Sequence, residues 1–216
     1  MVHNRRTYVD LYCERLAPGL IGEPLNTLSN VAFFIAAWLV ARDARRLRAM
    51  RADIAVLAVL SVVVGIGSIV FHMLATTWAK WLDLLPIFVF QLAFLWIYAR
   101  RELRWRALPS AVLVAAFLAI ALYARQFEEP LNGSITYAPA LVTLFALGLH
   151  HRAIHRGEPL LLVAAGVFTL SLFLRTIDAA ACTRFPLGTH FFWHLLNGLV
   201  LYLAVRSQLG AVERAH

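Results

Sequence analysis

The chain alternates between long apolar stretches and short segments that carry most of its charges. A transmembrane helix needs about 20 mostly apolar residues, within a working range of roughly 17–25. Seven stretches come close to that length, and Pro or charged residues mark most of their ends. We expect spans over residues 25–41, 54–75, 81–99, 107–124, 134–149, 159–175 and 189–206. The pattern therefore predicts an all-α fold, an integral membrane bundle of seven transmembrane helices.

Composition supports a membrane setting and excludes several soluble classes of protein. Of the 216 residues, 61% are hydrophobic and 15% are charged, and the mean hydropathy is +0.72. A soluble domain has roughly 45–50% apolar and about 25% charged residues. These values exclude a disordered chain, a disulfide-rich secreted scaffold and a nucleic-acid-binding module, although the formal net charge is +8. No repeat or long linker divides the chain, so we expect a single domain over residues 1–216.

The distribution of Lys and Arg predicts the orientation, because positive charges in short loops stay on the cytoplasmic side. The basic runs follow the first, third and fifth expected spans and comprise Arg42, Arg45, Arg46, Arg48, Arg51, Arg100, Arg101, Arg104, Arg106, Arg152 and Arg156. The alternate loops hold Lys80, then Arg125 with Glu128 and Glu129, then Arg175, Asp178 and Arg184. We expect the amino terminus outside, with residues 1–24 an extracytoplasmic segment, and the carboxyl terminus in the cytoplasm. Those 24 residues lack an apolar core, so we expect no cleavable signal peptide.

Five polar side chains fall inside the expected spans, where such residues are costly and by default mark a functional site. With the predicted orientation, Ser68 and His72 lie in the last two turns of the second span, near the outer face. Asp83 lies in the first turn of the third span. His190 and His194 lie in the first two turns of the seventh, so all five share one depth.

The spacing of these residues predicts a metal site. His190 and His194 are four residues apart and therefore share one helical face, as do Ser68 and His72. Three neutral imidazoles and one open position are typical of a catalytic zinc site. We predict that His72, His190 and His194 bind zinc, with Asp83 serving the water. The alternatives are that Asp83 only caps its helix and that Ser68 only bonds its own backbone.

A second pair with the same spacing, His151 and His155, falls at the cytoplasmic end. Arg152 and Arg156 flank it, and the pattern places no acidic span residue at that depth. Because neighbouring cations oppose metal binding, we interpret this pair as solvated loop histidines.

Both cysteines fall on the predicted extracytoplasmic side, where oxidation is permitted. Cys13 lies in the amino-terminal segment and Cys182 lies between the sixth and seventh expected spans. A disulfide would hold the amino-terminal segment over the start of the seventh span. Two unrelated buried thiols are the alternative.

Taken together, these motifs resemble those of the alkaline ceramidase family, within a superfamily of seven-helix membrane hydrolases that includes the adiponectin and progestin receptors. The resemblance runs through the segments DLYCE, EPLNTLSN, SIVFH, LDLLP, RTIDAAAC and HFFWH. The resemblance implies that His72, His190 and His194 are zinc ligands and that Ser68 and Asp83 belong to the active site. It also implies a disulfide between Cys13 and Cys182. It also implies a calcium site, to which Asp10, Glu14 and Glu23 correspond. DLYCERL departs from that pattern, with one extra residue between Asp and Cys and no Asn after Glu14.

Residues and resemblance together predict a zinc-dependent intramembrane hydrolase of ceramide-like N-acyl lipids, an amidohydrolase of sphingolipid metabolism. It would release a fatty acid and an amine, with Asp83 carrying the proton and Ser68 donating to the oxyanion. The expected partners are the lipid substrate and the bilayer, with no nucleic acid and no protein partner. The alternatives are a non-catalytic receptor or structural protein with a bracing zinc, and a bis-histidine haem protein. An Arg-rich, Lys-poor composition indicates a bacterial inner membrane.

Overall fold

The computed structural model describes residues 8–15, 17, 19–127, 130–155 and 158–209, and these are helical apart from their connections and one isolated bridge between Tyr8 and Thr76. The α-helices are α1 (Pro24–Ser29), α2 (Val31–Arg46), α3 (Ala52–Leu74), α4 (Thr77–Arg101), α5 (Ala107–Ala124), α6 (Ala138–Ile154), α7 (Leu160–Ala181) and α8 (His190–Ser207). Two 3₁₀ segments, η1 (Arg125–Phe127) and η2 (Pro130–Tyr137), connect α5 to α6. The predicted loop residues Glu128, Glu129 and Arg156 lie outside the described residues.

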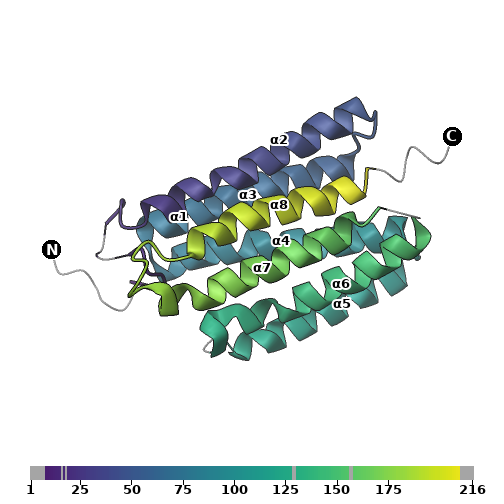
Figure 1. Cartoon of the computed structure of the whole chain (residues 1–216). Helices are drawn as coiled ribbons and strands as arrows, with labels where there is room; N and C mark the ends of the chain where they lie inside the picture. The colour runs from purple at the N-terminus through teal and green to yellow at the C-terminus, as the bar shows by residue number, and fades with distance from the viewer. Residues whose placement is uncertain (1–7, 16, 18, 128–129, 156–157, 210–216) are drawn as a thin grey trace.

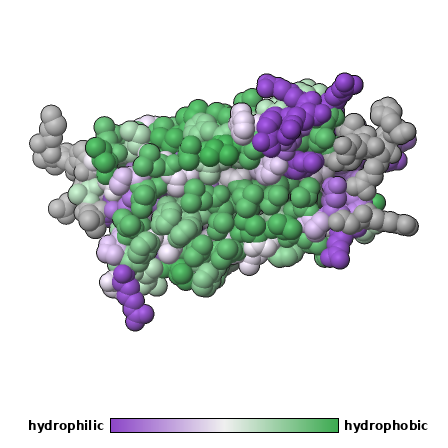
Figure 2. Space-filling model, turned by 45° about the horizontal axis from the view of Figure 1, so that its top comes forward, coloured by the Kyte–Doolittle hydropathy of each residue, from purple (hydrophilic) through white to green (hydrophobic). Residues whose placement is uncertain are grey.

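The long helices lie side by side and nearly parallel, so that the molecule is one elongated bundle (Figure 1). Six helical segments among the described residues are long and apolar enough to cross a membrane. Figure 2 shows apolar side chains over the middle of one face and hydrophilic residues toward the two ends. Side chains such as Trp38, Leu108 and Val142 are more than half exposed. This outward apolar surface indicates a membrane protein.

α8 differs from the other long helices in its polarity. It has 18 residues and is not among the six apolar segments, since His190, His194 and Asn197 lower its hydropathy. It packs between α7 and α2 (Figure 1). At Gly198 a side chain would overlap the backbone of Ala32, so glycine allows α8 to approach α2 closely. This close packing holds the polar residues of α8 against the interior of the bundle.

The end of α7 differs from the prediction. The sixth expected span stops at residue 175, whereas α7 continues to Ala181. Arg175 and Asp178 therefore lie inside a helix and not in a loop. The helix continues through these charges because both have partners: Asp178 accepts the backbone N–H of His190, and Arg175 donates to the carbonyl of Asn132.

The largest apolar core fills the half of the bundle where α2 ends. Ile54, Leu57, Tyr98 and Leu161 are fully buried there, at the start of α3, the end of α4 and the start of α7. Because lipid is as apolar as these side chains, their close packing against one another is what stabilises this core. The opposite half contains the end of α3 and the start of α8, and it is there that buried polar residues gather.

Candidate metal centre

Three buried histidines converge at the end of the bundle where α8 begins. His72 lies in the last turn of α3, while His190 and His194 occupy the first two turns of α8. Each is at most 2% exposed. One ligand atom from each lies within 4.8 Å of the others. The structure thus brings together the three residues that the sequence singled out, called here the outer histidine triad.

The hydrogen bonds of two of these rings fix which nitrogen faces the centre. Nδ1 of His72 lies 2.5 Å from Oε2 of Glu23, so it donates its proton to the carboxylate. Nδ1 of His194 lies 2.7 Å from the hydroxyl of Ser29, which itself donates to the carbonyl of Asn26. That hydroxyl must therefore accept from His194. In both rings Nε2 is left with a free lone pair.

These two lone pairs face each other, with Nε2 of His72 lying 3.1 Å from Nε2 of His194. Two acceptors repel at that separation unless a cation lies between them. Two nitrogens bound tetrahedrally to zinc at about 2.0–2.1 Å lie about 3.3 Å apart. Nδ1 of His190 is also buried without a hydrogen-bond partner among the described residues. A divalent ion with imidazole ligands fits this arrangement.

Ser68 and Asp83 lie beside the triad because α3 and α4 approach closely. At Gly67 even a methyl group would overlap the carbonyl of Leu82, so only glycine permits this contact. The hydroxyl of Ser68 lies 3.5 Å from Nε2 of His194 and bonds the carboxylate of Asp83. Asp83 is six residues beyond the first residue of α4, whose cap is Thr76. The alternative that Asp83 only caps its helix is therefore wrong.

Asp178 is a buried carboxylate to which the sequence assigned no role at this site. It accepts the backbone N–H groups of Cys13, Thr189 and His190 at 3.1, 2.6 and 2.9 Å. The first residues of a helix leave unpaired N–H groups that an anion stabilises. Asp178 therefore positions the start of α8 and, with it, His190. An acid within an apolar stretch of the RTIDAAAC segment was the signal that could have revealed it.

A polar hollow adjoins the triad and is lined by Lys80, Asp83, Arg125, Thr136, Tyr137 and Arg175. The guanidinium of Arg175 lies over the rings of Tyr12, Tyr137 and Trp193, 5.5–5.9 Å from their centroids. It also donates to the carbonyl of Asn132 at 2.8 Å. The sequence had placed Arg175 at a loop, so its role as a buried cation near Asp83 was missed.

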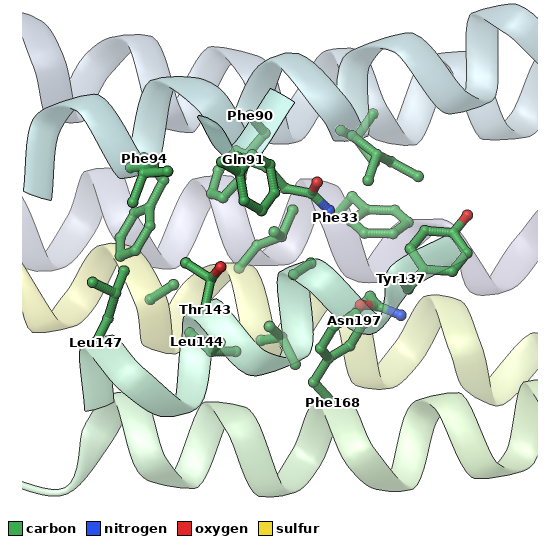
Figure 3. A pocket seen from close by; sticks show the side chains of 18 of the residues that line it. Phe33, Phe90, Gln91, Phe94, Tyr137, Thr143, Leu144, Leu147, Phe168 and Asn197 are labelled. Carbon is green, nitrogen blue, oxygen red and sulfur yellow. The ribbon is translucent and has the colours of Figure 1, made fainter. Parts of the chain in front are cut away.

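An apolar cavity of about 100 Å³ lies beside this hollow, inside the bundle. Its walls include Phe33, Phe90, Phe94, Leu147, Phe168 and Val200. Tyr137 and Trp193 line both the hollow and the cavity, so the two are adjacent. In Figure 3, Tyr137 lies at one end of the cavity and Leu147 at the other. The apolar walls of this cavity suit an apolar chain whose polar group lies in the adjacent hollow.

A family model described as Ceramidase matches residues 11–211. The chain belongs to the ceramidase family. The matched range contains the whole outer histidine triad together with Ser68 and Asp83. No individual curated protein gives a significant match. The membership predicted from the sequence motifs is confirmed.

The disulfide implied by the ceramidase resemblance is present. Cys13 and Cys182 are bonded, with their Cα atoms 5.3 Å apart. The alternative of two unrelated thiols is therefore wrong. Because Cys182 directly follows α7, the bond holds the amino-terminal segment against the end of that helix. Tyr12, the residue before Cys13, is thereby stacked on His190 with ring centroids 3.5 Å apart.

The carboxylates proposed for calcium do not fit that ion in this ceramidase-family chain. Asp10 is exposed, whereas Glu14 uses both oxygens to accept the backbone N–H groups of Leu25 and Asn26. The structure therefore does not support the calcium site.

A buried arginine supplies the positive charge in this region. Arg15 bonds Glu23 and the carbonyl of His72, and its side chain is fully buried. Burial raises the pKa of Glu23, but hydrogen bonds from His72, Arg15 and Asn26 outweigh burial and hold that pKa below its usual range. The guanidinium of Arg15 is thus a cation held directly against the carboxylate of Glu23.

The interpretation of His151 as a solvated loop residue is wrong. His151 lies in the last turn of α6 and is only 2% exposed. The sequence did not anticipate an acid at this depth, yet Glu102 at the end of α4 lies beside the pair. A residue at the end of a helix is buried when a neighbouring helix covers it. The spacing of residues within one helix does not reveal such a neighbour.

Proposed function

We propose that the protein is a zinc-dependent intramembrane amidohydrolase that cleaves the amide bond of a ceramide-like N-acyl lipid to a fatty acid and an amine. Membership of the ceramidase family supports amide hydrolysis. The observation that carries the proposal is the pair of Nε2 lone pairs of His72 and His194, 3.1 Å apart beside Asp83. A purely structural zinc would not need a carboxylate and a hydroxyl at its open side.

His72, His190 and His194 would hold the zinc, which when bound supplies a Lewis acid that activates water near neutral pH and polarises the amide carbonyl. Glu23 and Ser29 bond the Nδ1 atoms of two of these rings and so fix their tautomers and orientation. Partners of this kind typically matter nearly as much as the ligands themselves.

Asp83 is the group that moves the proton in this proposal. Its carboxylate takes a proton from the attacking water and returns it to the nitrogen of the leaving amine, which otherwise departs poorly. Ser68 lies between Asp83 and His194, where its hydroxyl can donate to the negative charge that develops on the carbonyl oxygen. Arg175, close to Asp83, provides a fixed positive charge in the same hollow.

The two adjoining cavities correspond to the two parts of an N-acyl lipid. The apolar cavity, with Phe33, Phe94 and Phe168 in its walls, suits the acyl chain. The polar hollow suits the amine part, because it contains ionisable side chains and lies at the end of the bundle. Tyr137 and Trp193 at their junction would flank the scissile amide.

We also propose that α8 completes a single domain of seven crossings, with the triad at the extracytoplasmic end of a bacterial inner-membrane protein. A helix of 18 residues is about 27 Å long, close to the thickness of the hydrocarbon core. Basic residues end α2, α4 and α8 at the other end of the bundle. Positive charge there favours a cytoplasmic location for that end.

Hydrolysis tests the proposal directly. The purified protein, loaded with zinc in detergent micelles, is incubated with a set of N-acyl lipids that includes ceramides, and the released fatty acid is identified by mass spectrometry. We expect release that Ser68→Ala and Asp83→Asn reduce while zinc stays bound. Ser61→Ala is the matched control, because Ser61 is buried on the same helix but bonds only the carbonyl of Leu57.

Zinc at full occupancy with no release from any lipid in the set would favour a non-catalytic protein braced by zinc.

A further inference from the structure

A second group of metal-ligating side chains lies at the opposite end of the bundle from the outer histidine triad. Glu102 directly follows α4, His151 lies in the last turn of α6, and His155 directly follows α6. One ligand atom from each lies within 4.8 Å of the others, and this is the second of two such groups among the described residues. These three residues are called here the inner cluster.

The imidazole of His151 is buried without hydrogen-bond partners among the described residues. The residue is 2% exposed, and neither Nδ1 nor Nε2 has a hydrogen-bond partner among the described residues. A neutral imidazole carries one donor and one acceptor, and buried polar atoms are nearly always paired. The nearby hydroxyl of Tyr98 does not serve it, since it bonds the carbonyl of Leu147 and Nδ1 of His150. A ligand for one of the two nitrogens is therefore expected.

The other two members of the inner cluster present a carboxylate and a second imidazole to the same place. Oε2 of Glu102 lies 2.6 Å from Nε2 of His155, and the side chain of Glu102 is only 5% exposed. The rings of His151 and His155 lie 4.4 Å apart between centroids. A buried carboxylate aimed at two imidazoles is an arrangement that a divalent cation stabilises.

The charges around His151 also favour a cation. The ionisable neighbours with the strongest influence on it are His155, Glu102, Glu158 and His150, two imidazoles and two carboxylates. Arg152, which flanks His151 in the sequence, is exposed and lies outside this set. Arg152 therefore does not oppose metal binding at the cluster in the way that the sequence suggested, while Arg156, the other flanking arginine, lies outside the described residues.

We propose that Glu102, His151 and His155 bind a divalent transition-metal ion of the zinc class at the inner end of the bundle. Two imidazoles and one carboxylate are a ligand set that such ions accept. On binding, Nε2 of His155 would exchange its hydrogen bond with Glu102 for the ion, and both groups would become ligands. This site is independent of the proposed hydrolysis.

The position of the inner cluster indicates a structural tie and not a catalytic site. Glu102 lies 19 residues after Asp83, about 28 Å farther along α4. Leu147, one turn before His151, lines the end of the apolar cavity farthest from Tyr137 (Figure 3). An ion here joins the ends of α4 and α6 beyond the cavity, so it closes the cavity floor.

Zinc stoichiometry tests this proposal. The full chain is stripped with a chelator in detergent micelles, reloaded with Zn²⁺, desalted and analysed for zinc and protein. We expect two zinc ions per chain in the parent protein, one in His151→Ala, one in His194→Ala and none when both changes are combined. His150→Ala is the matched control and keeps both ions, because the ring nitrogen Nδ1 of His150 is already bonded by Tyr98.

The ion that each single variant retains also reports that the variant is folded. A milder change, Glu102→Gln, should weaken zinc binding at the inner cluster while the outer ion stays. Cobalt gives an independent signal: in His194→Ala, one Co²⁺ should produce visible absorption that Glu102→Gln shifts or abolishes. One zinc in the parent protein, retained in His151→Ala and lost in His194→Ala, overturns the proposal, as does the absence of any cobalt signal in His194→Ala.

Discussion

Oε2 of Glu23 lies 2.5 Å from Nδ1 of His72, and this contact determines which nitrogen of that ring faces the other two histidines. Glu23 comes just before α1 and His72 at the end of α3, so the contact also joins two elements that are 49 residues apart in sequence. A carboxylate that accepts the far N–H of a ligating imidazole raises its basicity and fixes its tautomer. Glu23 is therefore a positioning residue for the proposed zinc.

Glu23→Gln tests that role. The amide keeps the shape but loses the charge, so we expect zinc affinity to fall about 10- to 100-fold, the usual effect of losing such a partner. Competition with a chelating dye measures the zinc affinity. Glu14→Gln is the control, since among the described residues Glu14 bonds the backbone N–H groups of Leu25 and Asn26 and no ligand histidine, so zinc affinity should stay unchanged. Equal zinc affinity in Glu23→Gln and the parent would contradict the assignment.

The next prediction concerns zinc binding by the outer histidine triad. His194→Ala removes one of two facing Nε2 atoms, so we expect zinc at the outer site to fall at least about tenfold at limiting metal. Elemental analysis of purified protein checks this. Full occupancy of the outer site in His194→Ala would exclude the triad as the metal site.

Asp83→Asn separates metal binding from catalysis. The amide preserves size and hydrogen bonding but removes the base, so zinc should stay bound while hydrolysis falls about 10²- to 10⁴-fold. Zinc analysis and fatty-acid release are measured on the same sample. Asp53→Asn is the control, because Asp53 lies at the other end of the bundle, where it pairs with Arg51 and Arg101. Loss of zinc in Asp83→Asn would instead make Asp83 a ligand.

The disulfide should contribute strongly to stability. Cys13 and Cys182 are 169 residues apart in sequence, and closing a long loop restricts the unfolded chain. We expect Cys13→Ser to reduce the free energy of unfolding by about 2–5 kcal/mol. Thermal unfolding with and without reductant measures this. Labelling of two thiols in denatured but unreduced parent protein would show that the bond does not form.

We expect the stability of the protein to be independent of calcium, because Arg15 already pairs with the carboxylate of Glu23. The side chains of Arg15 and Glu23 are at most 2% exposed, and removing one partner of a buried ion pair typically costs about 3–5 kcal/mol. We expect Arg15→Met to lose stability of that order, and the melting temperature of the parent to be equal in calcium and in EGTA. Arg42→Met is the control: Arg42 is 40% exposed, so losing its pair with Asp43 should cost under about 1 kcal/mol. A higher melting temperature of the parent in calcium would contradict this prediction.

Apolar length and charge distribution were sufficient to predict most of the helices. Each expected span is largely helical in the structure, because a stretch of about 20 apolar residues can satisfy its backbone in lipid only as a helix. The shared depth of His72 and His194 also followed from counting along oppositely directed helices. The two cysteines were predicted to lie on one side by the same reasoning, and their bond is confirmed.

The partners of those residues were decided only by tertiary structure. Nothing in the local pattern shows that Glu23 reaches His72, or that Asp178 reaches the start of α8, since those contacts depend on how helices pack. The same limit explains the error at His151, which spacing and flanking charges placed in solvent. Its burial arises because Tyr98 in the last turn of α4 and Glu102 just after it lie beside the end of α6. Periodicity determines which side chains share a face of one helix, whereas only packing determines what that face meets.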